Sequence, residues 1–247
     1  MTPANLSIQW LGRVDFQQAL ALQDRLVAER RIGRIPDQLL LLEHDPVYTM
    51  GRTPDQTSLR GTAHLIHPVV HINRGGQATY HGPGQLVGYP ILDLRDYGQD
   101  LHLYLRSLEE LLIRVCAQFG VTARRRETLT GTWVADRKIA SIGIGVRSWI
   151  SMHGFALNVC GDLAPFTEIT PCGIAGVAMT TLAKEFGQPV SVKDAAGAVS
   201  RLFCECLPAS PVTSPGNSSV TAYPPALISI QGETALRGSG THGAAAP

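Results

Sequence analysis

The sequence contains no apolar run long enough to cross a bilayer. Its longest runs are Leu39 to Leu42 and Ile139 to Val146, the second of them interrupted by Ser and Gly, whereas a spanning helix needs about 20 apolar residues. The first residues, Met1 to Gln17, also lack the basic flank and the apolar core of a secretory signal. We therefore expect a cytoplasmic protein that does not act on a membrane.

Strong net charge, a disulfide framework and a metal-ligand cluster are also missing. A net charge of +1 provides no field to attract nucleic acid. The 5 cysteines are odd in number and show no framework spacing, which predicts free thiols in a reducing compartment. Cys204 and Cys206 point different ways on a predicted helix, and His64, His67 and His71 lack thiolate or carboxylate company at ligand spacing. We expect no metal site.

The chain divides into a folded part and a tail of different composition. After Leu207 the sequence becomes rich in Ser, Thr, Pro, Gly and Ala. Such a segment cannot bury enough apolar surface to offset the entropy of ordering it. We predict a domain over residues 1–208 and a disordered tail over 209–247, with at most a brief ordered piece near Ala226 to Ile230.

Helical and strand patterns are mixed without regular βαβ alternation, which predicts an α+β domain. Amphipathic spacing predicts helices at Leu11 to Arg31, from an Asp100 cap to Phe119, and from a Ser191 cap to about Cys206. Apolar runs bounded by turn residues predict strands at Leu39 to Glu43, Val47 to Met50, Val69 to Asn73, Gln85 to Leu94, Thr132 to Val134, Lys138 to Val146, and Phe155 to Val159.

One segment is unusually rich in glycine and in hydrogen-bond donors. It reads Arg74-Gly75-Gly76-Gln77-Ala78-Thr79-Tyr80-His81-Gly82-Pro83-Gly84-Gln85. A structural turn needs one or two glycines, and glycine also lets backbone N–H groups approach a ligand closely. The segment is therefore interpreted as a ligand-binding loop, with a long surface loop as the alternative.

Lysine is scarce, and one lysine stands in a strand pattern. The chain has three lysines, at 138, 184 and 193, against eighteen arginines. Lysine is the base of the two whose pKa burial can lower, because arginine stays charged. Lys138 begins the segment Lys138-Ile139-Ala140-Ser141-Ile142-Gly143. From composition alone it is also explained as a hairpin-turn lysine after Asp136-Arg137.

A cysteine in a turn and a histidine beside a glycine complete the candidate chemistry. Pro171 before and Gly173 after place Cys172 in a tight turn, where exposed backbone N–H groups favour the thiolate. Met152-His153-Gly154-Phe155-Ala156 contains a histidine that is equally explained as a buried side chain satisfied by the backbone. Arg124-Arg125-Arg126 is interpreted as a solvated basic turn, with a contact for an acidic partner as the alternative.

Together these segments resemble the lipoyl (octanoyl) transferase family. The resemblance rests on Arg74 to Gln85, on Glu43-His44-Asp45-Pro46-Val47-Tyr48-Thr49-Met50-Gly51, on Lys138 to Gly143, on His153 to Val159 and on Pro171-Cys172-Gly173-Ile174. They occur in the order and at the spacing of the family, over roughly Leu6 to Leu207. Cys160 departs from the pattern, since the family usually has a small polar residue there.

The resemblance implies a mixed sheet flanked by helices, a fold shared with biotin and lipoate protein ligases. It implies transfer of an octanoyl group from acyl carrier protein to lysines of lipoyl domains, in 2-oxoacid dehydrogenases and in the glycine cleavage H protein, without a cofactor. Cys172 would carry the acyl thioester and Lys138 would lower the pKa of that cysteine. The implied substrate-binding residues are Arg74, Gly75, Gly76, Gln77, Ala78, Thr79, Tyr80, His81, Ser141, Ile142, Gly143, Gly154, Phe155 and Ala156.

The sequence leaves three other functions open. An ATP-dependent lipoate or biotin ligase would share the fold, although no phosphate-binding GxxxxGK[ST] sequence occurs. A cysteine hydrolase would pair Cys172 with His81 or His153 and release free acid. A non-catalytic binder of acyl carrier protein or of lipoyl domains would form no adduct. For the transferase, N–H groups around Gly75-Gly76 or at Cys172-Gly173 are the candidate donors to an oxyanion.

Overall fold

A computed structural model describes residues 6–53 and 55–208 of the chain, and the predicted tail lies outside these residues. The helices are α1 (Phe16–Arg31), α2 (Leu101–Gln118), α3 (Leu182–Phe186) and α4 (Val192–Cys206). The strands are β1 (Leu6–Val14), β2 (Asp37–His44), β3 (Val47–Met50), β4 (Val69–His71), β5 (Thr79–His81), β6 (Gln85–Ile91), β7 (Arg124–Arg126), β8 (Leu129–Val134), β9 (Arg137–Arg147), β10 (Ile150–Asn158) and β11 (Ala178–Met179).

The strands form one large mixed sheet and one small sheet. The large sheet has the order β1-β2-β6-β10-β9-β8-β7, and β11 pairs with β9 off this path. Two pairings, β1 with β2 and β11 with β9, are parallel, and the others in this sheet are antiparallel. The small sheet has the order β4-β3-β5. The prediction of an α+β domain with a mixed sheet is confirmed.

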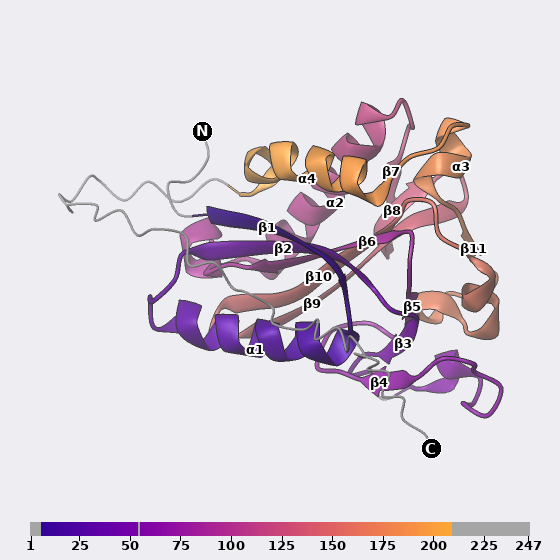
Figure 1. Ribbon diagram of the computed structural model, residues 1–247, viewed down its shortest axis with the longest axis horizontal. Coiled ribbons are helices and arrows are strands. Elements are labelled where there is room, and N and C mark those ends of the chain that lie inside the picture. The colour runs from indigo at the N-terminus through magenta and orange to yellow at the C-terminus, as the bar shows by residue number, and fades with distance from the viewer. Residues whose placement is uncertain (1–5, 54, 209–247) are drawn as a thin grey trace, which may run out of the picture. The chain divides into compact units, whose positions relative to one another are not determined.

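Helices cover both faces of the large sheet (Figure 1). On one face α1 packs against β6 and β10 and buries Leu26 and Val27. On the other face α2 and α4 pack together and against β6, β8, β9 and β10. A strand covered on both faces reads as a continuous apolar run. This explains the run Leu39 to Leu42 in β2, whose side chains are all buried.

The helix predicted at Leu11 to Arg31 starts too early. Leu11 to Val14 belong to β1, and α1 begins at Phe16, where Asp15 caps it by accepting from the N–H of Gln18. β1 is stabilised by parallel pairing with β2, which is distant in sequence. The apolar spacing of this stretch is compatible with a helix, but pairing with a distant strand makes it a strand, and a local pattern cannot show that pairing.

The two caps predicted for the later helices are confirmed. The carboxylate of Asp100 accepts from the N–H groups of His102 and Leu103 at the start of α2. The hydroxyl of Ser191 accepts from the N–H of Asp194 at the start of α4. Each cap satisfies N–H groups that the helix itself leaves without a partner.

Pairing of β11 with β9 brings the segment around Cys172 to the large sheet. Met179 lies opposite Lys138 in this parallel ladder, and the N–H of Thr180 donates to the carbonyl of Lys138. The segment that ends in β11 begins with the 3-10 turn Pro171–Gly173. The β11–β9 pairing thus brings the segment that contains Cys172 next to Lys138, although the two residues are more than 30 positions apart in the sequence.

Candidate active site

A cavity of about 290 Å³ opens beside β9, β10 and the turn Pro171–Gly173. It is lined by Cys172, by Lys138 and by the predicted substrate-binding residues Arg74, Gly75, Gly76, Gln77, Thr79, His81, Ser141, Ile142, Gly143, Gly154, Phe155 and Ala156. The structure thus brings together four segments that are scattered along the sequence.

Ala78 and Tyr80 do not line this cavity. Side chains alternate between the two faces of a strand, and Thr79 and His81 take the cavity side of β5. Ala78 and Tyr80 are buried on the opposite side, in a cluster with Tyr48. The carbonyl of Ala78 still acts on the site, because it accepts from the N–H of Cys172 at 2.8 Å.

Cys172 sits in a strained turn. Its backbone is left-handed, with φ 56° and ψ 17°, a conformation that residues other than Gly rarely adopt. Gly173 follows with φ +71°, and a Cβ there would lie 2.2 Å from Oε1 of Gln77. The thiol is half-buried, and its Sγ lies 3.6 Å from the hydroxyl oxygen of Ser141. The turn therefore presents the thiol to the cavity from a fixed backbone.

Lys138 is the lysine that the fold buries. Its side chain is 1% exposed, whereas Lys184 and Lys193 are exposed. Its ammonium lies 5.4 Å from the centre of the Trp133 ring. Gly131 faces the same side chain, since a Cβ there would lie 2.8 Å from Cε of Lys138. A glycine and an aromatic ring together shape the slot for this ammonium.

The charges around Cys172 favour its thiolate. Burial raises the pKa of the Cys172 thiol, but the charge of Lys138, hydrogen bonds from Ser141 and Lys138, and the charge of Arg74 outweigh it. The pKa of Cys172 therefore lies below its ordinary value. By contrast, burial raises the pKa of Cys116 to about 12. Of these two thiols, Cys172 is the one prepared to act as a nucleophile.

Arg74 is a second buried cation at the site. One terminal nitrogen donates to the carbonyl and the hydroxyl of Thr49, at 3.0 and 2.9 Å, and the other donates to the carbonyl of Gly75. Burial lowers the pKa of Arg74, yet a guanidinium stays protonated in proteins. Arg74 thus contributes positive charge near Cys172 from a position that its own hydrogen bonds hold.

The histidines of the cavity are neutral at physiological pH. Burial and the neighbouring cations lower the pKa of His81 to about 3 and that of His153 to about 4. The ring nitrogens of His81 already contact Gln85 and Thr49. Nε2 of His153 is buried without a hydrogen-bond partner among the described residues. Within the described residues neither histidine ring hydrogen-bonds the Cys172 thiol, whose partners are Ser141 and Lys138, and this arrangement does not favour a cysteine–histidine hydrolase.

Three of the four candidate oxyanion donors are already used within the protein. The N–H groups of Gly75, Cys172 and Gly173 donate to the carbonyls of Ile144, Ala78 and Thr170. No such bond is recorded for the N–H of Gly76 within residues 55–208, and Gly76 lines the cavity. Gly76 is therefore the remaining backbone candidate.

Sequence reasoning did not assign several residues of the cavity wall. These are Phe16, Ile72, Val87, Tyr89, Leu105, Thr128, Leu129, Thr130, Ile144 and Ile174. The period of two along the predicted strand Gln85 to Leu94 could have placed Val87 and Tyr89 on one face. No pattern in the sequence tells which face lines a cavity.

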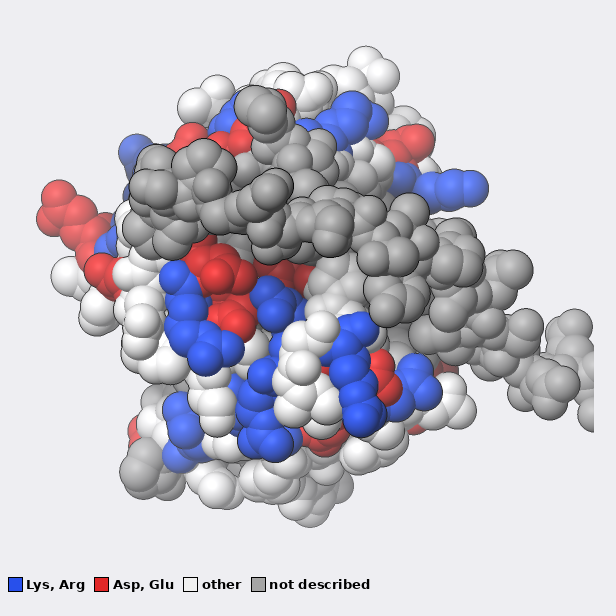
Figure 2. Space-filling view, turned by 90° about the vertical axis from the view of Figure 1, so that its left-hand side faces the viewer, with Lys and Arg blue, Asp and Glu red and all other residues white. Residues whose placement is uncertain are grey.

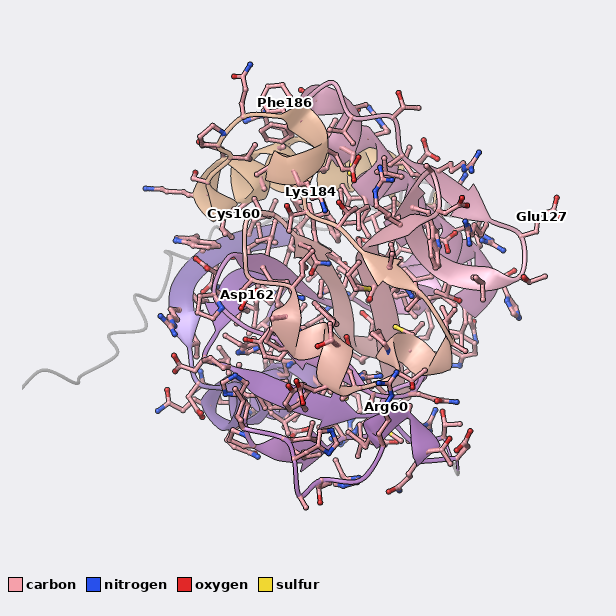
Figure 3. The ribbon with its side chains drawn as sticks, turned by 90° about the vertical axis from the view of Figure 1, so that its right-hand side faces the viewer. Arg60, Glu127, Cys160, Asp162, Lys184 and Phe186 are labelled. Atoms are coloured by element: carbon pink, nitrogen blue, oxygen red, sulfur yellow. The ribbon has the colours of Figure 1, made fainter. Side chains whose placement is uncertain are left out.

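Arg124–Arg126 and Cys160, which were singled out from the sequence, both lie at the surface. Arg124–Arg126 form strand β7, so the prediction of a turn is wrong, and Arg125 and Arg126 pair with Glu110 and Asp136. Cys160 is exposed on the loop after β10 (Figure 3), and burial together with Glu43 raises the pKa of its thiol. At neutral pH a smaller fraction of Cys160 than of Cys172 is therefore in the thiolate form.

The described residues are compatible with neither a metal cluster nor a membrane-spanning helix. Across residues 6–53 and 55–208, no group of three or more His, Cys, Asp or Glu side chains could hold a metal ion. Within the same residues no helix is long and apolar enough to cross a membrane. Figure 2 shows acidic and basic side chains interspersed on one face, in keeping with the net charge of +1.

Known proteins match both the sequence and the fold. The lipoyl protein ligase A/B catalytic domain family matches residues 15–204. The octanoyltransferase of Geobacter sulfurreducens is 52% identical over 205 residues, which are 81% of this chain and 86% of that protein. The octanoyltransferase of Geobacter metallireducens is 51% identical over 80% of this chain and 92% of that protein.

Solved structures share the fold at low sequence identity. A lipoate-protein ligase A bound with ATP superposes with a TM-score of 0.62 at 16% identity, covering 82% of this chain and 84% of that one. A biotin protein ligase from Aquifex aeolicus gives 0.50 at 14% identity, covering 81% and 69%. These likenesses establish the biotin/lipoate protein ligase-like fold. The family match and the half-identical relatives go further, and the chain belongs to the octanoyltransferase family of lipoyl protein ligase A/B catalytic domains.

Proposed function

We propose that this chain transfers an octanoyl group from octanoyl-acyl carrier protein to the lipoyl-accepting lysine of lipoyl domains, with residues 1–208 as the catalytic domain. The acceptors we expect are the lipoyl domains of 2-oxoacid dehydrogenases and the glycine cleavage H protein. The activity follows from the family, whose relatives are octanoyltransferases. The assignment of individual residues is supported by the geometry of the cavity.

One observation carries the residue assignment. A cysteine in a left-handed turn faces a cavity beside a buried lysine, and the two segments are joined by the β11–β9 ladder. Burying an ammonium is costly unless the charge is paired and hydrogen-bonded. Here its charge lowers the pKa of the Cys172 thiol, which is what a nucleophilic cysteine requires.

In the first half-reaction, the Cys172 thiolate attacks the thioester carbonyl of the carrier-bound octanoyl group. A new carbon–sulfur bond forms to Cys172, and the bond to the carrier sulfur breaks. The carrier leaves as a thiolate and takes up a proton, which the Lys138 ammonium can donate. The Arg74 cation and the N–H of Gly76 both line the cavity, and they are our candidates for stabilising the negative charge that develops on the carbonyl oxygen.

In the second half-reaction, the acceptor lysine amine attacks the acyl thioester on Cys172. An amide bond forms, Cys172 leaves as thiolate, and the proton lost by the amine passes to the neutral Lys138 amine. The cycle ends with the thiolate and ammonium with which it began. Because the donor is already a thioester, no ATP is consumed.

A transfer assay tests this function. The purified chain is mixed with octanoyl-acyl carrier protein and a lipoyl domain, without ATP, and octanoylated lysine is measured by mass spectrometry. We expect transfer, with initial rates that give parallel lines in double-reciprocal plots, because the two substrates react in separate steps. Transfer only from free octanoate with ATP would identify a ligase instead, and binding without transfer would identify a non-catalytic protein.

A further inference from the structure

The proposed function leaves open how an acyl chain of eight carbons is selected. Each additional methylene that a tunnel buries improves affinity only about fourfold. A tunnel with an open end would therefore prefer longer chains. Strong selection requires a wall at the end of the site against which a longer chain clashes.

The strand register shows the path that the acyl chain would follow. Ser141 of β9 lies opposite Ala156 of β10, Ala156 lies opposite Val87 of β6, and Val87 lies opposite Leu42 of β2. Three of these side chains, those of Ala156, Val87 and Leu42, pack on the face that α1 covers. Ala156 and Val87 line the cavity and form a row across its floor, which begins where Ser141 contacts the Cys172 thiol, and Leu42 continues this row beyond the cavity.

The length of this row fits an octanoyl group. Neighbouring strands are about 4.8 Å apart, so the row from Ser141 to Val87 spans about 9.6 Å. An extended eight-carbon acyl chain on Cys172 therefore ends above Val87. What closes the row at this point decides whether a longer chain fits.

The rings of Phe16 and Tyr89 close the row above Val87 and Leu42. Leu40 of β2 lies opposite Tyr89, and His44 lies two positions beyond Leu42 on the same strand. Tyr89 and His44 thus lie on opposite sides of the pair Val87–Leu42. The Tyr89 hydroxyl donates to Nε2 of His44 at 2.7 Å, so this hydrogen bond crosses the row. Phe16 packs against the His44 ring with centroids 5.0 Å apart, and both Phe16 and Tyr89 line the cavity.

Contacts with β1 and with the start of α1 hold His44 and Phe16 in place. Nδ1 of His44 donates to the carbonyl of Val14 at 2.8 Å, which leaves Nε2 to accept from Tyr89. Phe16 is the first residue of α1, is 3% exposed, and follows the helix cap Asp15. Burial lowers the pKa of His44, so its ring is uncharged and the terminal methyl group of an acyl chain can lie beside it. The rings of Phe16, Tyr89 and His44 are all buried from solvent.

We propose that Phe16 and Tyr89, braced by His44, form the end wall of the acyl site and limit the transferred chain to about eight carbons. This inference rests on the proposed function. It adds the residues that set the chain length, which neither the sequence pattern nor the similarity to relatives identifies.

The test compares substrates of different length on one variant and one matched control. Phe16→Ala removes the ring from the wall, whereas Leu26→Ala removes a buried side chain of the same helix that does not line the cavity. For Phe16→Ala we expect the ratio of kcat/KM for decanoyl- over octanoyl-acyl carrier protein to rise about sixteenfold, since two more methylenes fit and each contributes about fourfold. Leu26→Ala should keep the wild-type ratio.

A second variant changes the length in the opposite direction. Ala156→Val adds two methyl groups halfway along the row, and we expect it to favour hexanoyl over octanoyl relative to wild type. Wild-type transfer of octanoate with unchanged length profiles in both cavity variants would overturn the wall while leaving the function standing. No transfer by the wild-type chain would overturn the function itself.

Discussion

At the scale of single residues, the site depends on the opposition of burial and charge at one thiol. Burial alone would raise the pKa of Cys172, as it does for Cys116. The ammonium of Lys138 and the guanidinium of Arg74 reverse this effect. Both cations are buried, and both lie on segments that the sequence separates from the cysteine. The reactive state of Cys172 is thus a property of the assembled site.

The pH dependence of acylation tests the role of Lys138. Lys138→Met removes the cation and leaves the desolvation, so the pKa of Cys172 must rise. We expect the midpoint of the pH–rate profile for the first half-reaction to move at least about one pH unit towards alkaline pH. Lys184→Met, which removes an exposed lysine on α3, serves as the control. An unchanged midpoint in Lys138→Met would contradict this role.

At the scale of elements, the turn Pro171–Gly173 and the short strand β11 together position Cys172. β11 fixes the segment to β9 at Lys138, and the turn holds Cys172 in a left-handed conformation. Gly173 allows the side chain of Gln77 to lie directly against the turn. The loop is therefore positioned at both ends, and its geometry sets the direction of the thiol.

Two glycines of this loop provide a matched pair of variants. Gly173 and Gly176 both have positive φ, but only at Gly173 would a Cβ meet another group, namely Gln77. Each change to Ala should cost about 1 kcal/mol of stability because of the backbone conformation. We expect Gly173→Ala to slow acylation of Cys172 at least about tenfold, and Gly176→Ala to keep the wild-type rate. Equal rates in single-turnover measurements would show that the contact with Gln77 is irrelevant.

Most elements could be predicted from the sequence because their signals are local. The Asp100 and Ser191 caps and the apolar run of β2 each depend on adjacent residues. β1 could not be separated from α1, because its ladder with β2 is non-local and contains an irregularity between Trp10 and Arg13. The proximity of Lys138 and Cys172 also had no local signal, since it depends on the β11–β9 pairing.

At the scale of the whole molecule, a mixed sheet covered on both faces must bury polar side chains as well as apolar ones. His81 and His153 are buried neutral, with pKa values lowered from 6.5 to about 3 and about 4. The unfolded chain takes up these protons below pH 6.5, whereas the folded chain resists until its own lower pKa values. Stability is therefore full above about pH 6.5 and falls as the pH decreases below it.

The size of this effect follows from the two values. Between pH 7.5 and pH 5 each histidine should lower the free energy of unfolding by about 2 kcal/mol, or about 4 kcal/mol together. Urea unfolding at the two pH values measures it. His153→Asn, which tolerates the positive φ at this position, should remove about half of the difference. A variant with the full wild-type difference would show that His153 does not carry this proton linkage.

The central claim is that Cys172 carries the octanoyl group, and the intact mass of the chain tests it most directly. The protein is incubated with octanoyl-acyl carrier protein without ATP, weighed, mapped by peptide analysis and then mixed with a lipoyl domain. We predict one octanoyl adduct on Cys172 that the lipoyl domain discharges, present in Cys160→Ser and absent in Cys172→Ser. An adduct that persists in Cys172→Ser, or transfer at the full rate by that variant, would contradict the account.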